Sequence, residues 1–138
     1  MYFLNSYLIL KLTLNNLLIV EDHFLIGREI FKAAKEARKI ENIRLTDSLQ
    51  EAISLLTKTK FEVVILDLNL PDGNGIELLK WLKEKQIETK VFVFSASIAL
   101  KRSCLKNGAQ AFFDKANDFD ALIETIKNTS LESPSSLN

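Results

Sequence analysis

Two kinds of apolar pattern alternate along this chain. Short, wholly apolar runs are typical of strands buried in a parallel sheet, and longer segments with an apolar residue every three or four positions are typical of amphipathic helices. Strands are predicted at residues 17–20, 43–46, 61–66, 91–94 and 111–113. Each is followed by a segment of helical periodicity, at residues 26–37, 49–56, 76–82, 98–107 and 119–126.

Polar residues mark the ends of these elements. Asp47 or Ser48 is placed to cap the second helix, and Asn117 or Asp118 the last one, since a short side-chain oxygen there can accept a backbone N–H. Residues 71–73, Pro-Asp-Gly, form a strong turn signal after the third strand. Five strands alternating with five helices predict an α/β fold, a doubly wound parallel sheet with helices on both faces, because right-handed crossovers place them there.

Length and composition fit one domain without a strong attraction to nucleic acid. The 138 residues are 47% apolar, enough for a core, and 18 Lys and Arg balance 18 Asp and Glu. Because phosphate contacts need an excess of basic residues, direct nucleic-acid binding by this chain is not expected. The single cysteine, Cys104, excludes an internal disulfide and a cysteine-based zinc site, and it suits a reducing, cytoplasmic setting.

The two ends of the chain do not share the alternating pattern. Residues 1–15 are rich in Leu and aromatic side chains, but they lack the basic start of a secretory signal and are too often interrupted for a membrane span. We interpret them as an N-terminal extension, either a leader or, because leucines at positions 10, 12 and 14 alternate with other residues, an added strand or self-association segment. The domain is expected at residues 16–128, and the Ser-rich residues 129–138 are interpreted as a tail or linker.

Chemically active side chains follow four of the five predicted strands. Glu21 and Asp22 come after the first strand, Asp67 after the third, Ser95 after the fourth and Lys115 after the fifth. In parallel sheets, ligands bind beyond the carboxyl ends of the strands, so these side chains are expected to converge on one edge. Three carboxylates in contact are unfavourable unless a cation or a proton relieves them, and an all-oxygen set without His or Cys favours Mg²⁺.

Each of these residues alone would be an ordinary polar residue at a strand end, but their joint placement at one edge indicates a site. A haloacid-dehalogenase-type phosphohydrolase also uses an aspartate after an apolar strand. It needs a second aspartate two residues later, where this chain has Asn69. A flavin-binding flavodoxin-like protein would need a phosphate-binding loop after the first strand, where residues 21–24, Glu-Asp-His-Phe, would repel an anion.

Four separated segments carry a family resemblance: NLLIVEDH, VVILDLNLPDGNG, VFVFSAS and GAQAFFDK. They resemble the signature of bacterial two-component response-regulator receiver domains of the chemotaxis-regulator type, in the right order and spacing over residues 16–128. The resemblance implies a flavodoxin-like sheet whose strands lie in the order second, first, third, fourth and fifth. It also implies a phospho-acceptor switch in a His-Asp phosphorelay. It implies a signalling switch and not an enzyme, one that promotes only its own phosphorylation and dephosphorylation.

Carried over residue by residue, the resemblance assigns a role to each site position. Asp67 would take the phosphoryl group from a phosphohistidine of a sensor histidine kinase or phosphotransfer protein. Glu21, Asp22, Asp67 and the backbone carbonyl of Asn69 would hold Mg²⁺, and Lys115 would pair with the phosphoryl oxygens.

The switch itself would involve Ser95 and Phe112. The Ser95 hydroxyl would bind the phosphoryl group, and Phe112, which precedes the lysine by three residues, matches the aromatic that rotates with it. The output would be a population shift, worth roughly a few kcal/mol at most, at the face formed by the fourth helix, the fifth strand and the fifth helix. A downstream protein, or a second copy in a homodimer, would bind there.

One position departs from the family. Many receivers have a cis-proline after the conserved lysine, whereas this chain has Ala116, so the peptide geometry there stays open. A lysine followed by a residue other than proline resembles receivers joined to helix-turn-helix DNA-binding domains. Two alternatives therefore stand beside the switch: the receiver part of a longer transcriptional regulator, and a pseudo-receiver that only makes protein contacts.

Overall fold

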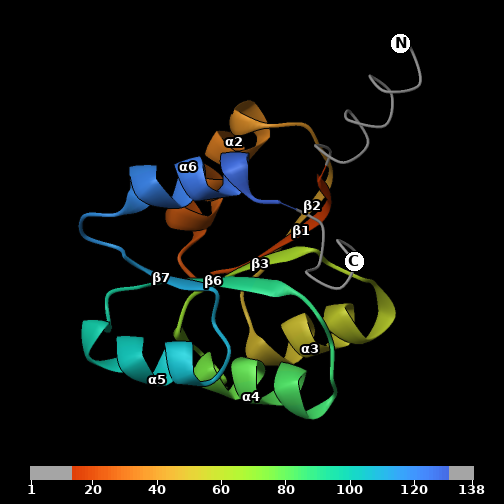
Figure 1. The fold of residues 1–138 in the computed structure, drawn as a ribbon, viewed down its shortest axis with the longest axis vertical. Helices are drawn as coiled ribbons and strands as arrows, with labels where there is room; N and C mark the ends of the chain where they lie inside the picture. Colours follow the sequence, from red (N-terminus) through yellow and green to blue (C-terminus); the bar gives the residue numbers. More distant parts are fainter. Residues whose placement is uncertain (1–13, 131–138) are drawn as a thin grey trace.

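A five-stranded parallel sheet forms the centre of the computed structural model, which describes residues 14–130 (Figure 1). Its strands are β1 (Leu14–Val20), β2 (Ile40–Thr46), β3 (Val63–Leu66), β6 (Lys90–Ser95) and β7 (Ala111–Asp114). Their order across the sheet is β2-β1-β3-β6-β7. This is the order expected from the resemblance, so the predicted α/β fold is confirmed.

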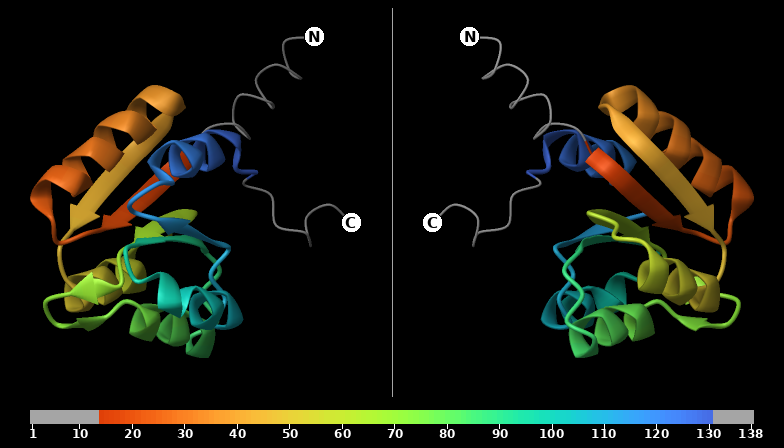
Figure 2. Two further views of the ribbon diagram at one scale, coloured as in Figure 1. Left: turned by 90° about the vertical axis from the view of Figure 1, so that its left-hand side faces the viewer. Right: turned by 90° about the vertical axis from the view of Figure 1, so that its right-hand side faces the viewer.

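In the described residues, five helices cover the two faces of this sheet. One face carries α2 (Phe24–Ala37) and α6 (Phe119–Asn128), and the other carries α3 (Leu49–Lys58), α4 (Ile76–Glu84) and α5 (Lys101–Lys106) (Figures 1 and 2). A short 3-10 turn, η1 (Ile98–Leu100), leads into α5, and a hairpin of β4 (Asn69–Leu70) and β5 (Gly73–Asn74) connects β3 to α4. None of these helices combines the length and the apolar character that crossing a bilayer would require.

Alternate strand residues pack into two separate cores, one on each face of the sheet. Side chains directed to α3, α4 and α5 include Leu18, Val20, Val64 and Leu66. Side chains directed to α2 and α6 include Leu17, Ile19, Val63 and Ile65. Successive strand residues point to opposite faces, and each fully buried Leu, Ile or Val contributes about 1.5–3 kcal/mol. These two cores therefore hold the strand ends in a fixed register.

Several strand boundaries differ from the prediction. β1 begins at Leu14, which pairs with Ile40 and is fully buried, so Leu14 and Asn15 belong to the sheet and not to the extension. The polar Asn16 interrupts the apolar pattern, but its backbone N–H is satisfied, since it donates to the side-chain Oε1 of Glu62, just before β3, at 2.7 Å. β2 also starts earlier than predicted, and β3 starts later. The interpretations of the chain before β1 and after position 130 lie outside the described residues.

Alternative caps were predicted at two helix starts, and the structure has a side-chain capping bond at α3 and none at α6, where the prediction of Asn117 or Asp118 as the cap is wrong. Ser48, and not Asp47, caps α3, because its Oγ accepts the N–H of Glu51 at 3.1 Å. Asp118 precedes α6, but its carboxylate accepts the N–H of Asp114 at 2.9 Å and makes no capping bond to the helix. That bond shapes the loop after β7, which carries the candidate lysine.

Candidate functional site

The carboxyl ends of β1 and β3 bring three carboxylates together. Val20 pairs with Leu66, and the ladder continues past them, since the Asp67 N–H donates to the Val20 carbonyl at 2.9 Å. Glu21 and Asp22 therefore lie beside Asp67 at the same edge of the sheet. Carboxylate oxygens from these three residues all lie within 4.8 Å of one another.

Lys115 reaches this cluster from the end of β7. Its backbone N–H donates to the Ser95 carbonyl at 3.1 Å, which positions the start of the loop. Its Nζ lies 2.7 Å from Glu21 Oε1 and 3.1 Å from Asp67 Oδ2. No peptide bond in the described part of the chain is cis, so the bond between Lys115 and Ala116 is trans. The Lys115 ammonium contacts Glu21 and Asp67 with this bond in the trans form.

The Lys115 ammonium compensates part of the negative charge of the two buried carboxylates in the cluster. Glu21 and Asp67 are only 4% and 3% exposed. Burial raises the pKa of Glu21, and the hydrogen bonds from Lys115 and from the His23 N–H offset this only in part. Burial alone would lower the pKa of Lys115, but the nearby carboxylates outweigh it and raise that pKa. Lys115 therefore remains a charged ammonium at neutral pH.

The donor atoms at this edge fit a hard divalent cation. Three carboxylates meet one ammonium, which leaves about two negative charges in excess within a small volume. Every side-chain donor of the cluster is a carboxylate oxygen, the ligand type that Mg²⁺ prefers. The residues present are therefore suited to hold such an ion.

Ser95 and Asn69 border the cluster. Ser95 is fully buried at the end of β6, and its Oγ accepts the N–H of Ser97 at 3.1 Å. The Asn69 N–H donates to Asp67 Oδ1 at 3.4 Å, and its side-chain amide donates to Ser97 Oγ at 3.4 Å. These bonds connect the loop after β3 to the loop after β6 beside the central aspartate.

Phe112 lies inside a core in this structure. It pairs with Val93 across β6 and β7, is 9% exposed and belongs to the same core as Cys104. Ser95 follows Val93 by two residues, so it faces the same side of the sheet as Phe112. The two side chains predicted to form the switch thus share one face, and the aromatic ring is already turned inward.

Gly75 is a position that the sequence reasoning did not identify. A Cβ at this position would lie 2.5 Å from the Asp67 carbonyl oxygen and 3.0 Å from Leu68 Cα, contacts that no side chain can make without moving the backbone. Its own N–H donates to the Leu68 carbonyl at 2.8 Å. The start of α4 therefore packs directly on the backbone of the central aspartate, and the glycine at the end of the turn was the available signal.

Asp72, noted from the sequence only as part of a turn, connects the β4–β5 hairpin to α3. Its Oδ1 accepts the Leu49 N–H at 2.8 Å and its Oδ2 accepts the Gln50 N–H at 2.9 Å. The bonds from Gln50 and Leu49 hold the pKa of Asp72 below its ordinary value. A negative charge at a helix N-terminus is also favoured by the helix dipole. The loop that follows the central aspartate is therefore coupled to α3.

Sequence comparison identifies the family. The sequence model described as the response regulator receiver domain matches residues 17–127. The transcriptional regulatory protein DegU of Brevibacillus brevis is 28% identical over 113 residues, which cover 80% of this chain and 48% of that protein. The polar-differentiation response regulator DivK of Brucella anthropi is 30% identical over 117 residues, which cover 82% of this chain and 94% of that protein. The chain thus spans about half the length of DegU and nearly all of DivK.

Solved structures agree with this assignment. The receiver domain of the Francisella response regulator 1452 is 28% identical with a TM-score of 0.73, and the match covers 80% of this chain and 92% of that one. A LuxR-family DNA-binding response regulator from Staphylococcus aureus is 25% identical with a TM-score of 0.74, and the match covers 82% of this chain and 98% of that one. With its sheet order, its acidic edge and these likenesses, the chain belongs to the response regulator receiver domain family of two-component signalling.

Proposed function

We propose that Asp67 is the phospho-acceptor of this receiver and that the chain acts as a phosphorylation-controlled switch in the cytoplasm. The observation that supports this most directly is the arrangement around its carboxylate. Asp67 lies within 4.8 Å of two further acids and 3.1 Å from the Lys115 ammonium, so an acceptor oxygen has both a candidate metal site and a fixed cation beside it. The phosphoryl donor would be a phosphohistidine of a sensor kinase or phosphotransfer protein.

The acidic edge would hold the divalent cation. Glu21, Asp22 and Asp67 would offer carboxylate oxygens, and the backbone carbonyl of Asn69, in β4, would complete the ligands from the protein. When bound, Mg²⁺ supplies positive charge that offsets the repulsion between the incoming phosphoryl oxygens and the acids.

The protein's own residues would perform the transfer. A carboxylate oxygen of Asp67 would form a bond to phosphorus as the bond from phosphorus to the donor histidine nitrogen breaks, which yields an acyl phosphate. The Lys115 ammonium, already 3.1 Å from Asp67 Oδ2, would pair with a phosphoryl oxygen and neutralise part of its charge. Hydrolysis of the acyl phosphate would later return Asp67 to a free carboxylate. Since both reactions change only the chain itself, it would act as a switch and not as an enzyme with a separate substrate.

The readout would begin at Ser95. Its buried Oγ now accepts the Ser97 N–H, and after phosphorylation the hydroxyl would donate to a phosphoryl oxygen and draw the β6–η1 loop inward. Since the Phe112 ring is already buried, with 9% of its surface exposed, it need not rotate inward. The expected change is instead a shift of this loop and of α5 around the ring. The affected face, α5, β7 and α6, is where a downstream partner or a second copy would bind.

Relatives of two lengths suggest two outputs. DegU is named a transcriptional regulatory protein and is about twice as long as the matched region, whereas DivK is matched over 94% of its length. In a chain of the first kind, phosphorylation would control an attached DNA-binding domain. In a chain of the second kind, it would control contacts with another protein.

Mass spectrometry tests the proposal. The chain is incubated with acetyl phosphate and Mg²⁺, and the wild type should gain the mass of one phosphoryl group while Asp67→Asn should gain none. Asp47→Asn removes a nearby exposed carboxylate and serves as the matched control, which should be phosphorylated like the wild type. Omission of Mg²⁺ in the presence of EDTA should abolish the mass gain. No labelling of the wild type would leave only the pseudo-receiver function, and equal labelling of wild type and Asp67→Asn would place the acceptor at another residue.

A further inference from the structure

The β4–β5 hairpin carries Asn69 at its base, and it needs outside contacts to hold its orientation. Its ladder has only two residue pairs, Asn69 with Asn74 and Leu70 with Gly73. An isolated two-stranded hairpin is at best marginally stable in water. Its orientation matters at the acidic edge, because the Asn69 N–H donates to Asp67 Oδ1 at 3.4 Å and the Asn69 carbonyl is a proposed metal ligand.

The tip of this hairpin is bound to the first turn of α3. Asp72 Oδ1 accepts the Leu49 N–H at 2.8 Å, and Asp72 Oδ2 accepts the Gln50 N–H at 2.9 Å. A carboxylate that accepts one N–H on each oxygen is fixed in rotation as well as in position. At Gly73, an added Cβ would lie 3.0 Å from Leu49 Cδ2, so the hairpin backbone also packs closely against the Leu49 side chain. The start of α3 therefore holds the hairpin at its tip.

Two side chains share the capping of α3. The N–H groups in the first turn of a helix have no carbonyl partner within it. Asp72 accepts those of Leu49 and Gln50, and Ser48 Oγ accepts that of Glu51 at 3.1 Å. Ser48 directly precedes the helix, whereas Asp72 lies 23 residues after Leu49 in the sequence. Loss of either cap would weaken the start of α3, but of the two only Asp72 also fixes the hairpin.

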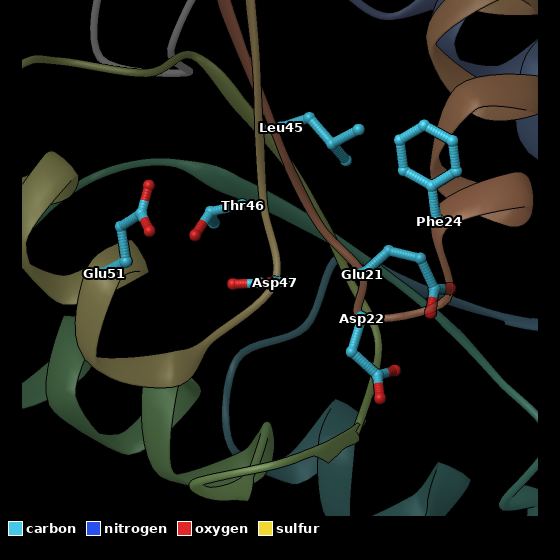
Figure 3. A pocket seen from close by; sticks show the side chains of 7 residues that line it. All are labelled: Glu21, Asp22, Phe24, Leu45, Thr46, Asp47 and Glu51. Atoms are coloured by element: carbon cyan, nitrogen blue, oxygen red, sulfur yellow. The ribbon is translucent and has the colours of Figure 1, made fainter.

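The charge of Asp72 also acts on the acidic edge, and another carboxylate allows that effect to be measured separately. A hollow of about 360 Å³ beside this edge is lined by Glu21 and Asp22 of the site and by Asp47 and Glu51 (Figure 3). The Asp47 side chain is exposed, and within residues 14–130 it forms no hydrogen bond or ion pair. Removal of the Asp47 charge therefore reports the electrostatic effect alone, without a change in the hairpin.

We propose that Asp72 is a positioning residue for the metal site: by binding the start of α3, it sets where the hairpin places Asn69. This inference rests on the proposed function, in which the Asn69 carbonyl binds Mg²⁺. Asp72 itself would touch neither the ion nor the phosphoryl group. Without its carboxylate, the hairpin would turn about its base, and the Asn69 carbonyl would be directed at the ion for less of the time. Loss of a group that orients a metal ligand typically weakens metal binding about 10–100-fold, and the lower end of this range is expected here.

Titration of the metal-free chain with MgCl₂, followed by ¹⁵N-¹H NMR, tests the proposal. Asp72→Ala should bind Mg²⁺ about tenfold more weakly than the wild type. Ser48→Ala removes the other cap of the same helix and should bind Mg²⁺ like the wild type. Asp47→Asn should bind Mg²⁺ less than about twofold more weakly, because water and salt screen an exposed charge. Asp72→Asn keeps the shape of the side chain and one acceptor oxygen, so its affinity should lie between those of the wild type and Asp72→Ala.

A second readout needs neither Mg²⁺ nor phosphorylation. In the metal-free protein, the Asn69 amide resonance should shift in Asp72→Ala, because its bond to Asp67 Oδ1 changes, and should keep its position in Ser48→Ala. With acetyl phosphate, the Mg²⁺ concentration for half-maximal phosphorylation should rise about tenfold in Asp72→Ala, whereas the rate at saturating Mg²⁺ should stay near that of the wild type.

The outcomes separate this inference from the phospho-acceptor role of Asp67. Wild-type Mg²⁺ affinity in Asp72→Ala, or an equal loss of affinity in Ser48→Ala or Asp47→Asn, would overturn the positioning role. Mg²⁺ binding by the wild type without phosphorylation would contradict the acceptor role and leave the inference about Asp72 intact. Absence of Mg²⁺ binding by the wild type would overturn both.

Discussion

Replacement of Asp67 by asparagine is expected to stabilise the folded chain when no divalent cation is present. The change removes one charge from a cluster in which three carboxylate oxygens lie within 4.8 Å of one another. It keeps the shape of the side chain and leaves Lys115 paired with Glu21 at 2.7 Å. The residue proposed to carry the chemistry is therefore a source of instability in the resting protein.

The distances at the site set the magnitude of this effect. At an effective dielectric constant of about 20, loss of the attraction to Lys115 at 3.1 Å costs about 5 kcal/mol. Relief of the repulsion from Glu21, which has a carboxylate oxygen within 4.8 Å, is worth at least about 3.5 kcal/mol, and relief from the exposed, water-screened Asp22 about 1 kcal/mol. Avoiding burial of a charge adds roughly 3 kcal/mol. The net expectation is a gain of at least about 2.5 kcal/mol in the free energy of unfolding.

Urea unfolding in EDTA, followed by the fluorescence of the single tryptophan, Trp81 on α4, measures this gain. The midpoint of Asp67→Asn should lie roughly 1 M above that of the wild type. Added Mg²⁺ should stabilise the wild type, by about 1.4 kcal/mol at ten times its Kd, and should stabilise the variant much less. Asp47→Asn, at an exposed position, should change stability by less than about 0.5 kcal/mol. A variant that unfolds more easily than the wild type in EDTA would refute the reasoning that repulsion and desolvation dominate at the site.

Three further changes test other parts of the structure. Gly75→Ala should lower the free energy of unfolding by about 1–3 kcal/mol and slow phosphorylation, because the new methyl group displaces the Asp67 carbonyl. Urea unfolding and a time course of phosphorylation measure the two effects, and wild-type values in both would contradict the prediction. Asp72 has a lowered pKa, so its contribution to stability is present above the unfolded value near 3.8 and is lost as pH falls through the folded value. Asp72→Asn should therefore be less stable than the wild type at neutral pH and approach it in acid, and a difference independent of pH would count against this role. Thr46→Val should raise the free energy of unfolding by about 1 kcal/mol, because it removes an unpaired buried hydroxyl; a loss of stability in a thermal melt would show that the hydroxyl is bonded.

The order of the elements and the main site residues follow from local patterns, whereas other features depend on contacts distant in sequence. Apolar runs place Asp67 and Lys115 at strand ends, and parallel pairing brings those ends to one edge, so their convergence needs no further information. The capping of α3 by Asp72 requires the β4–β5 hairpin to fold back over it, and two-residue strands leave no periodic signal. The hollow near Thr46 and Glu51 depends on the relative position of two loops, which no sequence period encodes.

The position of β7 at the edge of the sheet gives it an unusual mechanical role. It is hydrogen-bonded to one neighbour, β6, and its consecutive residues Phe112 and Phe113 lie in different cores. Lys115 follows directly at its end and contacts the central acids. β7 is therefore an edge strand that is hydrogen-bonded on one side only, and its carboxyl end is connected to the acidic site through Lys115. A displacement of Lys115 would move β7, and with it both Phe112, in the core beneath α5, and Phe113, in the core beneath α6. The two helices would therefore respond together although they lie on opposite faces of the sheet.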